Sequence, residues 1–101
     1  MEIKNVGLAG TLESSDAMVT IEPNEDGGIE FDLESVVKQQ YGRRIREVVM
    51  ETLEHLDVKD ARVKIVDKGA LDCTLRARVE CAVFRSNDQT TGLPWGGAIR
   101  S

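Results

Sequence analysis

Histidine and cysteine are scarce in this sequence, and long apolar runs are missing. His55 is the only histidine, and no cysteine lies near it at the spacing of metal ligands, so we expect no metal site. No apolar run approaches the roughly 20 residues that cross a bilayer. The amino terminus also lacks the basic start and apolar stretch of a secretory signal. We therefore expect a cytoplasmic protein with no membrane partner.

Basic charge is scarce in the first third of the chain. Residues 1–35 hold nine acidic side chains and Lys4, whereas residues 36–101 hold nine acidic and twelve basic ones, so balances of −8 and +3 give the net charge of −5. The sequence contains no long run of basic residues that would form a basic surface, so we expect no nucleic-acid partner. The asymmetry is either ordinary solvated surface or a docking surface for a larger charged partner.

Motifs of common enzymes are missing as well. The sequence has no Gly-x-Ser-x-Gly elbow, no phosphate-binding loop and no dinucleotide fingerprint, so we predict no catalytic residues. Ser14 and Ser15 instead stand between Glu13 and Asp16 in a polar loop, which we expect Leu12 to anchor. Because acidic neighbours hinder ionisation of a hydroxyl, another protein would have to perform any chemistry on these serines.

One segment, residues 34–56, has the apolar period of an α-helix. Its buried stripe falls at offsets 0, 4, 7, 8, 11, 12 and 15. The stripe consists of Tyr41, Ile45, Val48, Val49, Thr52, Leu53 and Leu56. We expect Ser35 to cap the start of this helix through its hydroxyl.

Four further segments are predicted as strands, and a fifth as either a strand or an ordered arm. Residues 17–22 and 29–34 alternate and flank a run of turn formers, so they predict a β-hairpin. Residues 61–65 predict a third strand, and residues 71–83, apolar at every odd position, predict a long central one. Residues 3–10 are either a short edge strand or an ordered arm.

The two cysteines fall within the predicted 71–83 strand. Cys73 and Cys81 would lie about 26 Å apart on its buried face at the rise of a strand. That separation is far beyond the reach of a disulfide. We therefore interpret both as small core residues in a reducing compartment.

The predicted fold class is α+β, in the order β-β-α-β-β. An antiparallel sheet of about four strands has one long helix packed on one face, and Arg62, Lys64, Arg76 and Arg78 lie on its exposed face. Residues 1–85 form one domain, and residues 86–101 form a flexible C-terminal tail. The apolar island Leu93-Pro94-Trp95 in this tail is either an anchor onto its own domain or a motif that contacts a partner.

Three motifs give the chain a resemblance to a known family. They are Ala-Gly-Thr-Leu-Glu-Ser-Ser-Asp at 9–16, Lys-Gly-Ala-Leu-Asp-Cys at 68–73 and Arg-Ala-Arg at 76–78. The sequence resembles the acyl carrier proteins (gamma chains) of citrate lyase, and segments 38–42 and 93–95 follow the layout of that family. Residues 1–85 would then be the acyl carrier domain.

The resemblance implies a covalent cofactor and a set of partners. The cofactor is a 2′-(5″-phosphoribosyl)-3′-dephospho-coenzyme A arm, joined through a phosphodiester to the serine that corresponds to Ser14. The family often has glycine at the next position, so Ser15 is a second candidate. A non-catalytic carrier would present acetyl and citryl thioesters to the alpha and beta chains, which cleave citrate to acetate and oxaloacetate. A prosthetic-group transferase and an acetylating ligase would be further partners.

Two alternatives to this interpretation stay open. The chain could be an unmodified structural or regulatory subunit of a multi-chain complex. It could also be the related carrier subunit of malonate decarboxylase, which bears the same type of arm but fits these motifs less well.

Overall fold

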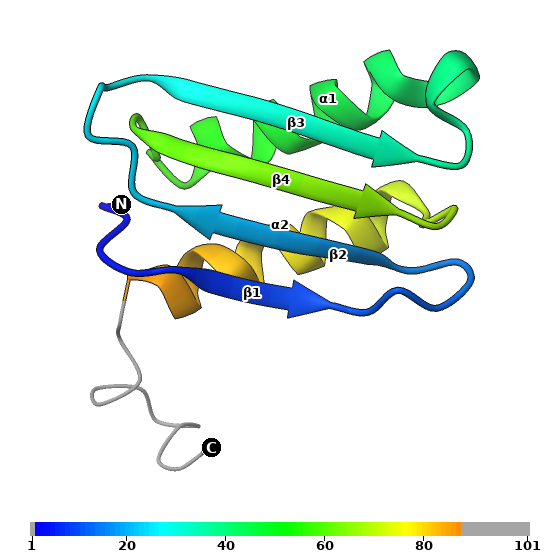
Figure 1. Ribbon diagram of the computed structural model, residues 1–101, viewed down its shortest axis with the longest axis horizontal. Coiled ribbons are helices and arrows are strands. Elements are labelled where there is room, and N and C mark those ends of the chain that lie inside the picture. The colour runs from blue at the N-terminus through cyan, green and yellow to red at the C-terminus, as the bar shows by residue number, and fades with distance from the viewer. Residues whose placement is uncertain (1, 88–101) are drawn as a thin grey trace, which may run out of the picture.

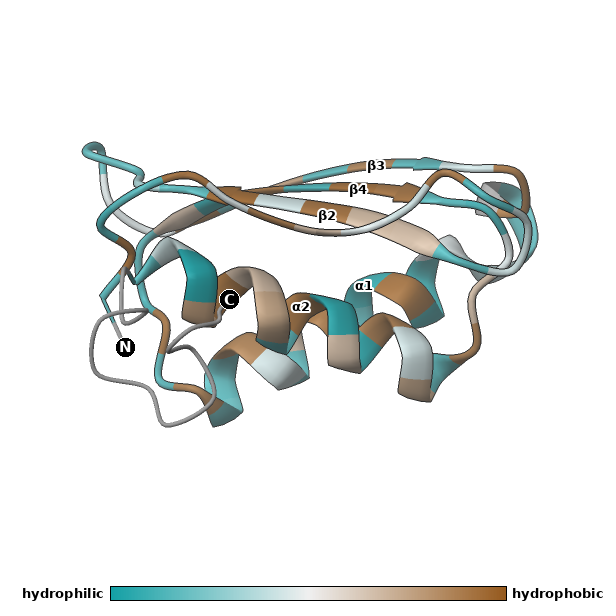
Figure 2. Cartoon of the chain, turned by 90° about the horizontal axis from the view of Figure 1, so that it is seen from below, coloured by the Kyte–Doolittle hydropathy of each residue, from teal (hydrophilic) through white to brown (hydrophobic). Residues whose placement is uncertain are grey.

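The fold has two layers, a four-stranded sheet and a pair of helices that cover one of its faces (Figures 1 and 2). The computed structural model describes residues 2–87, apart from the side chain of Lys38. The elements are β1 (Gly7–Gly10), β2 (Ala17–Glu22), β3 (Ile29–Ser35), α1 (Lys38–His55), β4 (Ala61–Asp67) and α2 (Asp72–Ser86). The α+β class and three predicted strands are confirmed, and residues 7–10 form the edge strand that was one of two alternatives.

The sheet is mixed, so the prediction of an antiparallel sheet is wrong. Its order is β1-β2-β4-β3, in which β1, β2 and β4 pair antiparallel while β3 runs parallel to β4. Parallel neighbours need a crossover connection, which α1 provides between β3 and β4. The register aligns Val19 with Ile65 and Leu33 with Ile65, so apolar side chains form a continuous row under the helices.

The predicted hairpin of β2 and β3 is also wrong, because β4 lies between these two strands. Crossing two strand spacings requires a span of about 9–10 Å, which the six residues 23–28 can make. The connection is fixed at the start of β4. The Gly28 N–H donates to Asp60 Oδ1 at 2.7 Å, and the Ala61 N–H donates to the Gly28 carbonyl at 3.0 Å.

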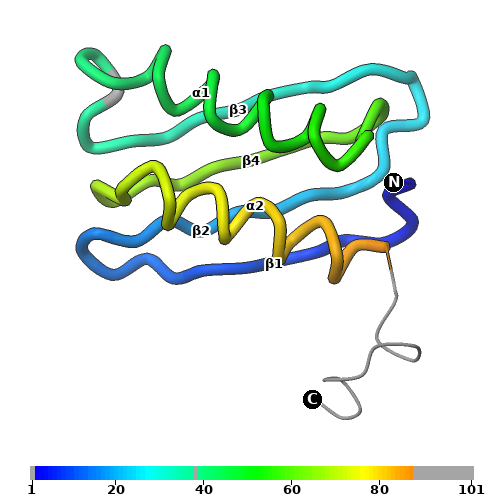
Figure 3. The backbone as a smooth tube through the Cα atoms, turned by 180° about the vertical axis from the view of Figure 1, so that it is seen from behind, coloured from blue at the N-terminus to red at the C-terminus, as the bar shows by residue number. Residues whose placement is uncertain are grey.

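Helix α1 buries most of the predicted stripe, with exceptions at both ends: Tyr41 is exposed, and Leu56, which follows the last residue of the helix, is only partly buried. Ile45, Val48, Val49, Thr52 and Leu53 are buried. Figure 3 shows α1 lying beside α2 on the covered face of the sheet. The first residue of the predicted stripe, the aromatic one at position 41, is 55% exposed because the covering layer ends before it.

Ser35 is not the predicted cap of α1. It is the last residue of β3, and the residue at the N-cap position, Val37, makes no side-chain capping hydrogen bond. The Ser35 hydroxyl accepts from the Val37 N–H at 3.1 Å and donates to Asp67 Oδ2 at 2.8 Å. It therefore joins the ends of β3 and β4 ahead of the helix.

The predicted fourth strand, residues 71–83, is helix α2, so the expectation of a single helix is wrong. The buried residues Leu75, Val79, Ala82, Val83 and Ser86 follow the helical offsets 0, 4, 7, 8 and 11. Apolar side chains occupy every odd position from 71 to 83, but of these only Leu75, Val79 and Val83 are buried, so the alternation does not reflect burial. A strand of 13 residues would also exceed the usual length of 3–10.

Because residues 72–86 form a helix and not a strand, four polar or sulfur-bearing side chains lie elsewhere than predicted. Arg76 and Arg78 lie on α2, on the covered side of the sheet, and only Arg62 and Lys64 remain on its exposed face. Cys73 is exposed and Cys81 is partly buried, so the prediction of two core cysteines is wrong. At the rise of an α-helix their Cα atoms lie about 12 Å apart, still too far for a disulfide.

Helix α2 packs closely on β1 because β1 carries a glycine where they meet. A Cβ at Gly7 would overlap the Ala82 carbonyl and the Ser86 backbone. The Lys4 and Asn5 N–H groups donate to the Ser86 carbonyl at 3.1 and 2.8 Å, so the start of the chain is tied to the end of α2. The tail predicted from residue 86 lies outside the described residues from residue 88 onward, together with its Leu93-Pro94-Trp95 island.

Candidate functional site

The loop that carries both candidate serines connects β1 to β2 at one end of the sheet (Figure 1). Leu12, Glu13, Ser14 and Ser15 are all exposed, as predicted for the serines. Leu12 is 54% exposed, so the prediction that it anchors the loop is wrong. The anchors lie at the two ends of the loop.

Gly10 allows the chain to enter this loop. Its φ is +93°, a left-handed conformation that residues with a Cβ rarely adopt. A Cβ there would overlap the Ala17 carbonyl and would come within 3.2 Å of Cδ of Arg78. The close approach of the two strands at the base of the loop therefore requires glycine.

Asp16 closes the other end of the loop, with a side chain that is 13% exposed. Arg78 of α2 donates to it twice, from Nε to Oδ1 at 2.9 Å and from Nη2 to Oδ2 at 3.1 Å. The Thr11 hydroxyl donates to Oδ2 at 2.7 Å, and the Ala17 N–H donates to Oδ1 at 2.7 Å. The Arg78 guanidinium, followed by these two donors, holds the pKa of the Asp16 carboxyl well below its usual range.

Backbone hydrogen bonds connect the second half of the loop to the segment after β4. The Ser15 N–H donates to the Lys68 carbonyl at 2.8 Å, and the Lys68 N–H donates to the Asp16 carbonyl at 2.8 Å. Ser15 has a left-handed φ of 67°. Its backbone is therefore fixed by two neighbouring segments.

Ser14 has no such backbone hydrogen bond to another described residue. The hydroxyls of Ser14 and Ser15 both lack a hydrogen-bond partner among residues 2–87, and both side chains are exposed at the turn of the loop. Asp16 is not placed to act as a base, because both of its oxygens already accept hydrogen bonds, and no hydrogen bond joins Glu13 to the Ser14 hydroxyl. The loop is therefore anchored at both ends and presents a serine hydroxyl that no neighbouring side chain activates.

The sequence identified the serines but not the residues that hold their loop. Gly10, Asp16, Lys68 and Arg78 all belong to motifs that carry the family resemblance, yet 62 positions separate Asp16 from its Arg78 partner. The sequence would have predicted the pairing of Asp16 with Arg78 only if residues 71–83 had been assigned to a helix.

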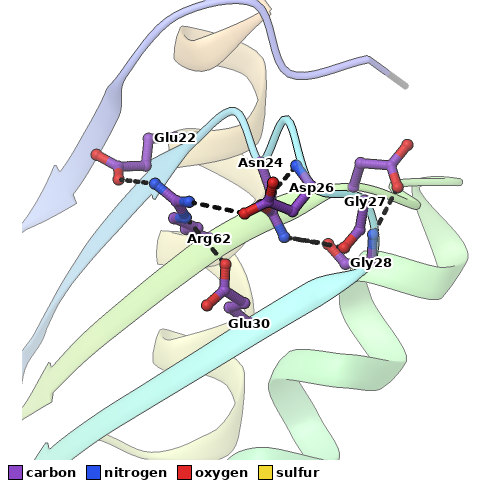
Figure 4. Close-up of polar contacts among 8 residues, drawn as sticks. Glu22, Asn24, Asp26, Gly27, Gly28, Glu30 and Arg62 are labelled. Atoms are coloured by element: carbon purple, nitrogen blue, oxygen red, sulfur yellow. Dashed lines mark hydrogen bonds and ion pairs between the residues drawn. The ribbon is translucent and has the colours of Figure 1, made fainter.

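Charged side chains also gather at the opposite end of the sheet, around Arg62 (Figure 4). Arg62 Nε lies 2.9 Å from Glu30 Oε2, and its Nη1 and Nη2 lie 3.8 Å and 3.7 Å from Glu22 Oε1 and Asp26 Oδ2. This network joins three strands and their connection. Glu30 is its nearest member and raises the pKa of the guanidinium.

Residues 2–87 contain no group of three or more histidine, cysteine, aspartate or glutamate side chains that could hold a metal ion. Neither helix in this part of the chain is long and apolar enough to cross a membrane.

Curated proteins with similar sequences are citrate lyase acyl carrier proteins. The one from Vibrio cholerae serotype O1 (strain M66-2) is 59% identical over 88 residues, which cover 87% of this chain and 90% of the relative. The one from Fusobacterium nucleatum subsp. nucleatum is 56% identical over 87% of this chain and 97% of the relative. For Escherichia fergusonii the identity is 56%, with coverages of 95% and 98%.

A family model and a solved structure extend this comparison. Residues 4–86 match the acyl carrier family model described as "Malonate decarboxylase delta subunit (MdcD)". The fold resembles a chain in the crystal structure of a Pseudomonas malonate decarboxylase hetero-tetramer in complex with malonate. Its TM-score is 0.68 at 18% identity, over 82% of this chain and 84% of that one, so the likeness concerns the fold.

The family model spans most of the chain, and the curated relatives share more than half of their aligned residues with it. The curated relatives and the family model both describe acyl carrier proteins. From this agreement we conclude that the chain belongs to the citrate lyase acyl carrier protein family.

Proposed function

We propose that this chain is the acyl carrier subunit of citrate lyase and that Ser14 bears a phosphoribosyl-dephospho-coenzyme A arm. The observation that carries the attachment site is an exposed loop with two fixed ends, in which the Ser14 hydroxyl has no hydrogen-bond partner among residues 2–87 and the Ser14 backbone, unlike that of Ser15, is not held by the segment after β4. A transferase can bind such a loop in one pose and reach one oxygen.

The neighbouring hydroxyl fits the arm less well. Ser15 has a left-handed backbone, and its N–H is held by the Lys68 carbonyl. Both serines lie at the turn with exposed side chains, so what separates them is that the backbone of Ser15 is held in place. The residues present thus favour Ser14 for a bulky charged substituent.

The chemistry at Ser14 requires an external catalyst. Its Oγ gives up a proton and forms one O–P bond, while the phosphate leaving group of an activated precursor departs. Because no described side chain accepts a hydrogen bond from the Ser14 hydroxyl, and the Asp16 carboxylate is occupied by other donors, we expect the transferase to supply the base. Once attached, the arm supplies a terminal thiol that carries acyl groups as thioesters.

The rest of the chain positions the arm and takes no part in bond cleavage. The Asp16–Arg78 pair and the Ser15–Lys68 hydrogen bond define where the arm begins. A tethered acyl group is held at high local concentration near the alpha and beta chains, which we propose as the partners that cleave citrate to acetate and oxaloacetate. We propose the cytoplasm as the location of this complex.

Attachment is tested by intact mass after incubation with the prosthetic-group transferase and its activated precursor. We expect the full mass increment on the wild-type chain and on Ser15→Ala, and none on Ser14→Ala. Ser14→Ala with a full increment would show that the site is wrong. A wild-type chain that never gains mass would instead favour the unmodified subunit.

A carrier for malonate decarboxylase is the second candidate, favoured by the description of the matching family model. Intact mass cannot separate the two, because the arm would be of the same type. The loaded chain should restore citrate cleavage to the alpha and beta chains of citrate lyase. Restoration of malonate decarboxylation alone would reverse our preference.

A further inference from the structure

An apolar groove of about 690 Å³ lies at the end of the molecule that carries Ser14. It runs between the start of α1 and the connection from β4 to α2. Its apolar lining includes Val37, Tyr41, Ile45, Ala70, Leu71 and Cys73. Tyr41 and Leu71 are 55% and 70% exposed, so large apolar side chains face solvent here. We call this feature the Tyr41 groove.

The Tyr41 groove and the Ser14 loop share one segment of chain. Lys68 exchanges backbone hydrogen bonds with Ser15 and Asp16, and the residues that follow it, 69–71, line the groove. Figure 3 shows the β1–β2 connection, the β4–α2 connection and the start of α1 at the same end. A group attached at Ser14 therefore begins beside this groove.

The polar groups of the groove match an adenine nucleotide. Asp67 is 2% exposed, and its oxygens accept from the Ser35 hydroxyl at 2.8 Å and the Ala70 N–H at 3.0 Å. Each oxygen keeps a further lone pair that can accept from an exocyclic amine. Tyr41 offers an aromatic face for stacking. Arg44 at the rim is paired with Asp72, which also lines the groove, through Nε at 2.9 Å and Nη2 at 2.8 Å from Oδ2, so a phosphate of the arm would compete with this carboxylate for the guanidinium.

We propose that the Tyr41 groove holds the adenine nucleotide portion of the arm on Ser14 and leaves the thiol end free to reach partner chains. This inference rests on the proposed function. Only the phosphoribosyl unit separates the adenine nucleotide from the attachment at Ser14, and a mostly apolar groove of this volume with few polar groups is typical of small-molecule sites. Docking of the nucleotide shortens the mobile part of the arm and raises the local concentration of its thiol.

The groove is tested on the unmodified full chain by NMR titration with free 3′-dephospho-coenzyme A. Adenosine 5′-monophosphate and pantetheine serve as separate probes. We expect the amides of Tyr41 and residues 69–71 to shift with the first two probes and not with pantetheine. Shifts from pantetheine alone, or from none of the three, would overturn the proposal.

Variants define the contact. Tyr41→Ala and Leu71→Ala should each weaken binding of 3′-dephospho-coenzyme A roughly tenfold, because both remove apolar area from the groove. Leu8→Ala is the matched control, since Leu8 is 51% exposed on β1 and does not line the groove. An equal loss in Leu8→Ala would show that the effect is not local.

Amide hydrogen exchange on the loaded chain separates this proposal from the attachment itself. If mass shows the arm on Ser14, slower exchange at residues 69–73 supports docking. Unchanged exchange, or protection that arises only when a partner chain is added, overturns docking and leaves the attachment intact. If no arm is taken up, the attachment fails and the titration with free nucleotide decides the groove alone.

Discussion

At the scale of single residues, two glycines allow the effect of backbone strain to be measured apart from that of steric overlap. Gly10 and Gly69 share a φ of +93°, but a Cβ at Gly10 would overlap the Ala17 carbonyl, whereas at Gly69 nothing lies within 4 Å. The pair therefore isolates the effect of close strand approach at the base of the Ser14 loop.

Gly10→Ala should destabilise the protein more than Gly69→Ala. Both substitutions incur about 1–2 kcal/mol for a left-handed alanine. The overlap at Gly10 should add about 1–3 kcal/mol, because backbone has to move. Urea denaturation of both variants measures the difference. Equal midpoints would contradict the close approach at the base of the loop.

The Asp16 carboxyl predicts a pH dependence. Because its folded pKa is depressed, the contribution of Asp16 to stability is full above its unfolded pKa of about 3.9 and is lost as the pH falls through the folded value. Asp16→Asn should therefore be less stable than wild type at pH 7, and this gap should narrow below about pH 4.

Unfolding midpoints at several pH values measure the gap. Asp32→Asn is the control, because Asp32 is exposed on β3 and forms no ion pair with another described residue. Its effect at pH 7 should stay within about 0.5 kcal/mol. A gap for Asp16→Asn that stays constant with pH would contradict its ion pair with Arg78.

At the scale of elements, α1 is held by the stripe that it buries. Leu53 is 1% exposed in the middle of this stripe. Leu53→Ala should cost about 2–5 kcal/mol of unfolding free energy, because it leaves a cavity under the helix. Glu54→Ala, on the exposed face, should change it by less than about 0.5 kcal/mol. A chemical-denaturation midpoint unaffected by Leu53→Ala would place the stripe elsewhere.

Two alanines distinguish helix α2 from the predicted strand, because the helix and the strand would bury opposite members of the pair. Ala77 is exposed and Ala82 is fully buried, whereas alternation from Leu71 would bury the first and expose the second. Ala77→Lys should change stability by less than about 0.5 kcal/mol. Ala82→Lys should cost about 3 kcal/mol or more, because it forces a charge into the core. The reverse order of thermal midpoints would support the strand.

At the scale of the whole molecule, the two ends of the sheet differ in their role. The end with Ser14 holds the loop, its Arg78 anchor and the Tyr41 groove, while the other end holds the Arg62 network. This arrangement predicts that substitutions affect modification according to the end on which they lie.

Arg78→Gln should slow transfer of the arm to Ser14 by roughly 10- to 100-fold, because a loop that loses its anchor presents the hydroxyl in many poses. Arg62→Gln is the matched control and should leave the rate unchanged. Initial rates of mass gain measure both, and circular dichroism checks that each variant is folded. Equal rates for wild type and Arg78→Gln would show that the transferase orders the loop by itself.

Local pattern in the sequence determined much of this protein. Helix α1, strands β2, β3 and β4, and the exposed serine loop follow from side-chain period and turn residues that act over a few positions. The motifs around Ser14 and Lys68 were sufficient for the family resemblance, which the curated relatives support.

Tertiary structure alone decided how these pieces meet. A side-chain period reports that a face is buried but not against which partner, so β4 could enter between β2 and β3 without any local sign. Small residues in 71–83 satisfy both a strand and a helix period, and packing on β1 and β2 selected the helix. The Asp16–Arg78 pair and the Tyr41 groove then arise because this helix begins beside the serine loop, a juxtaposition of segments far apart in the chain.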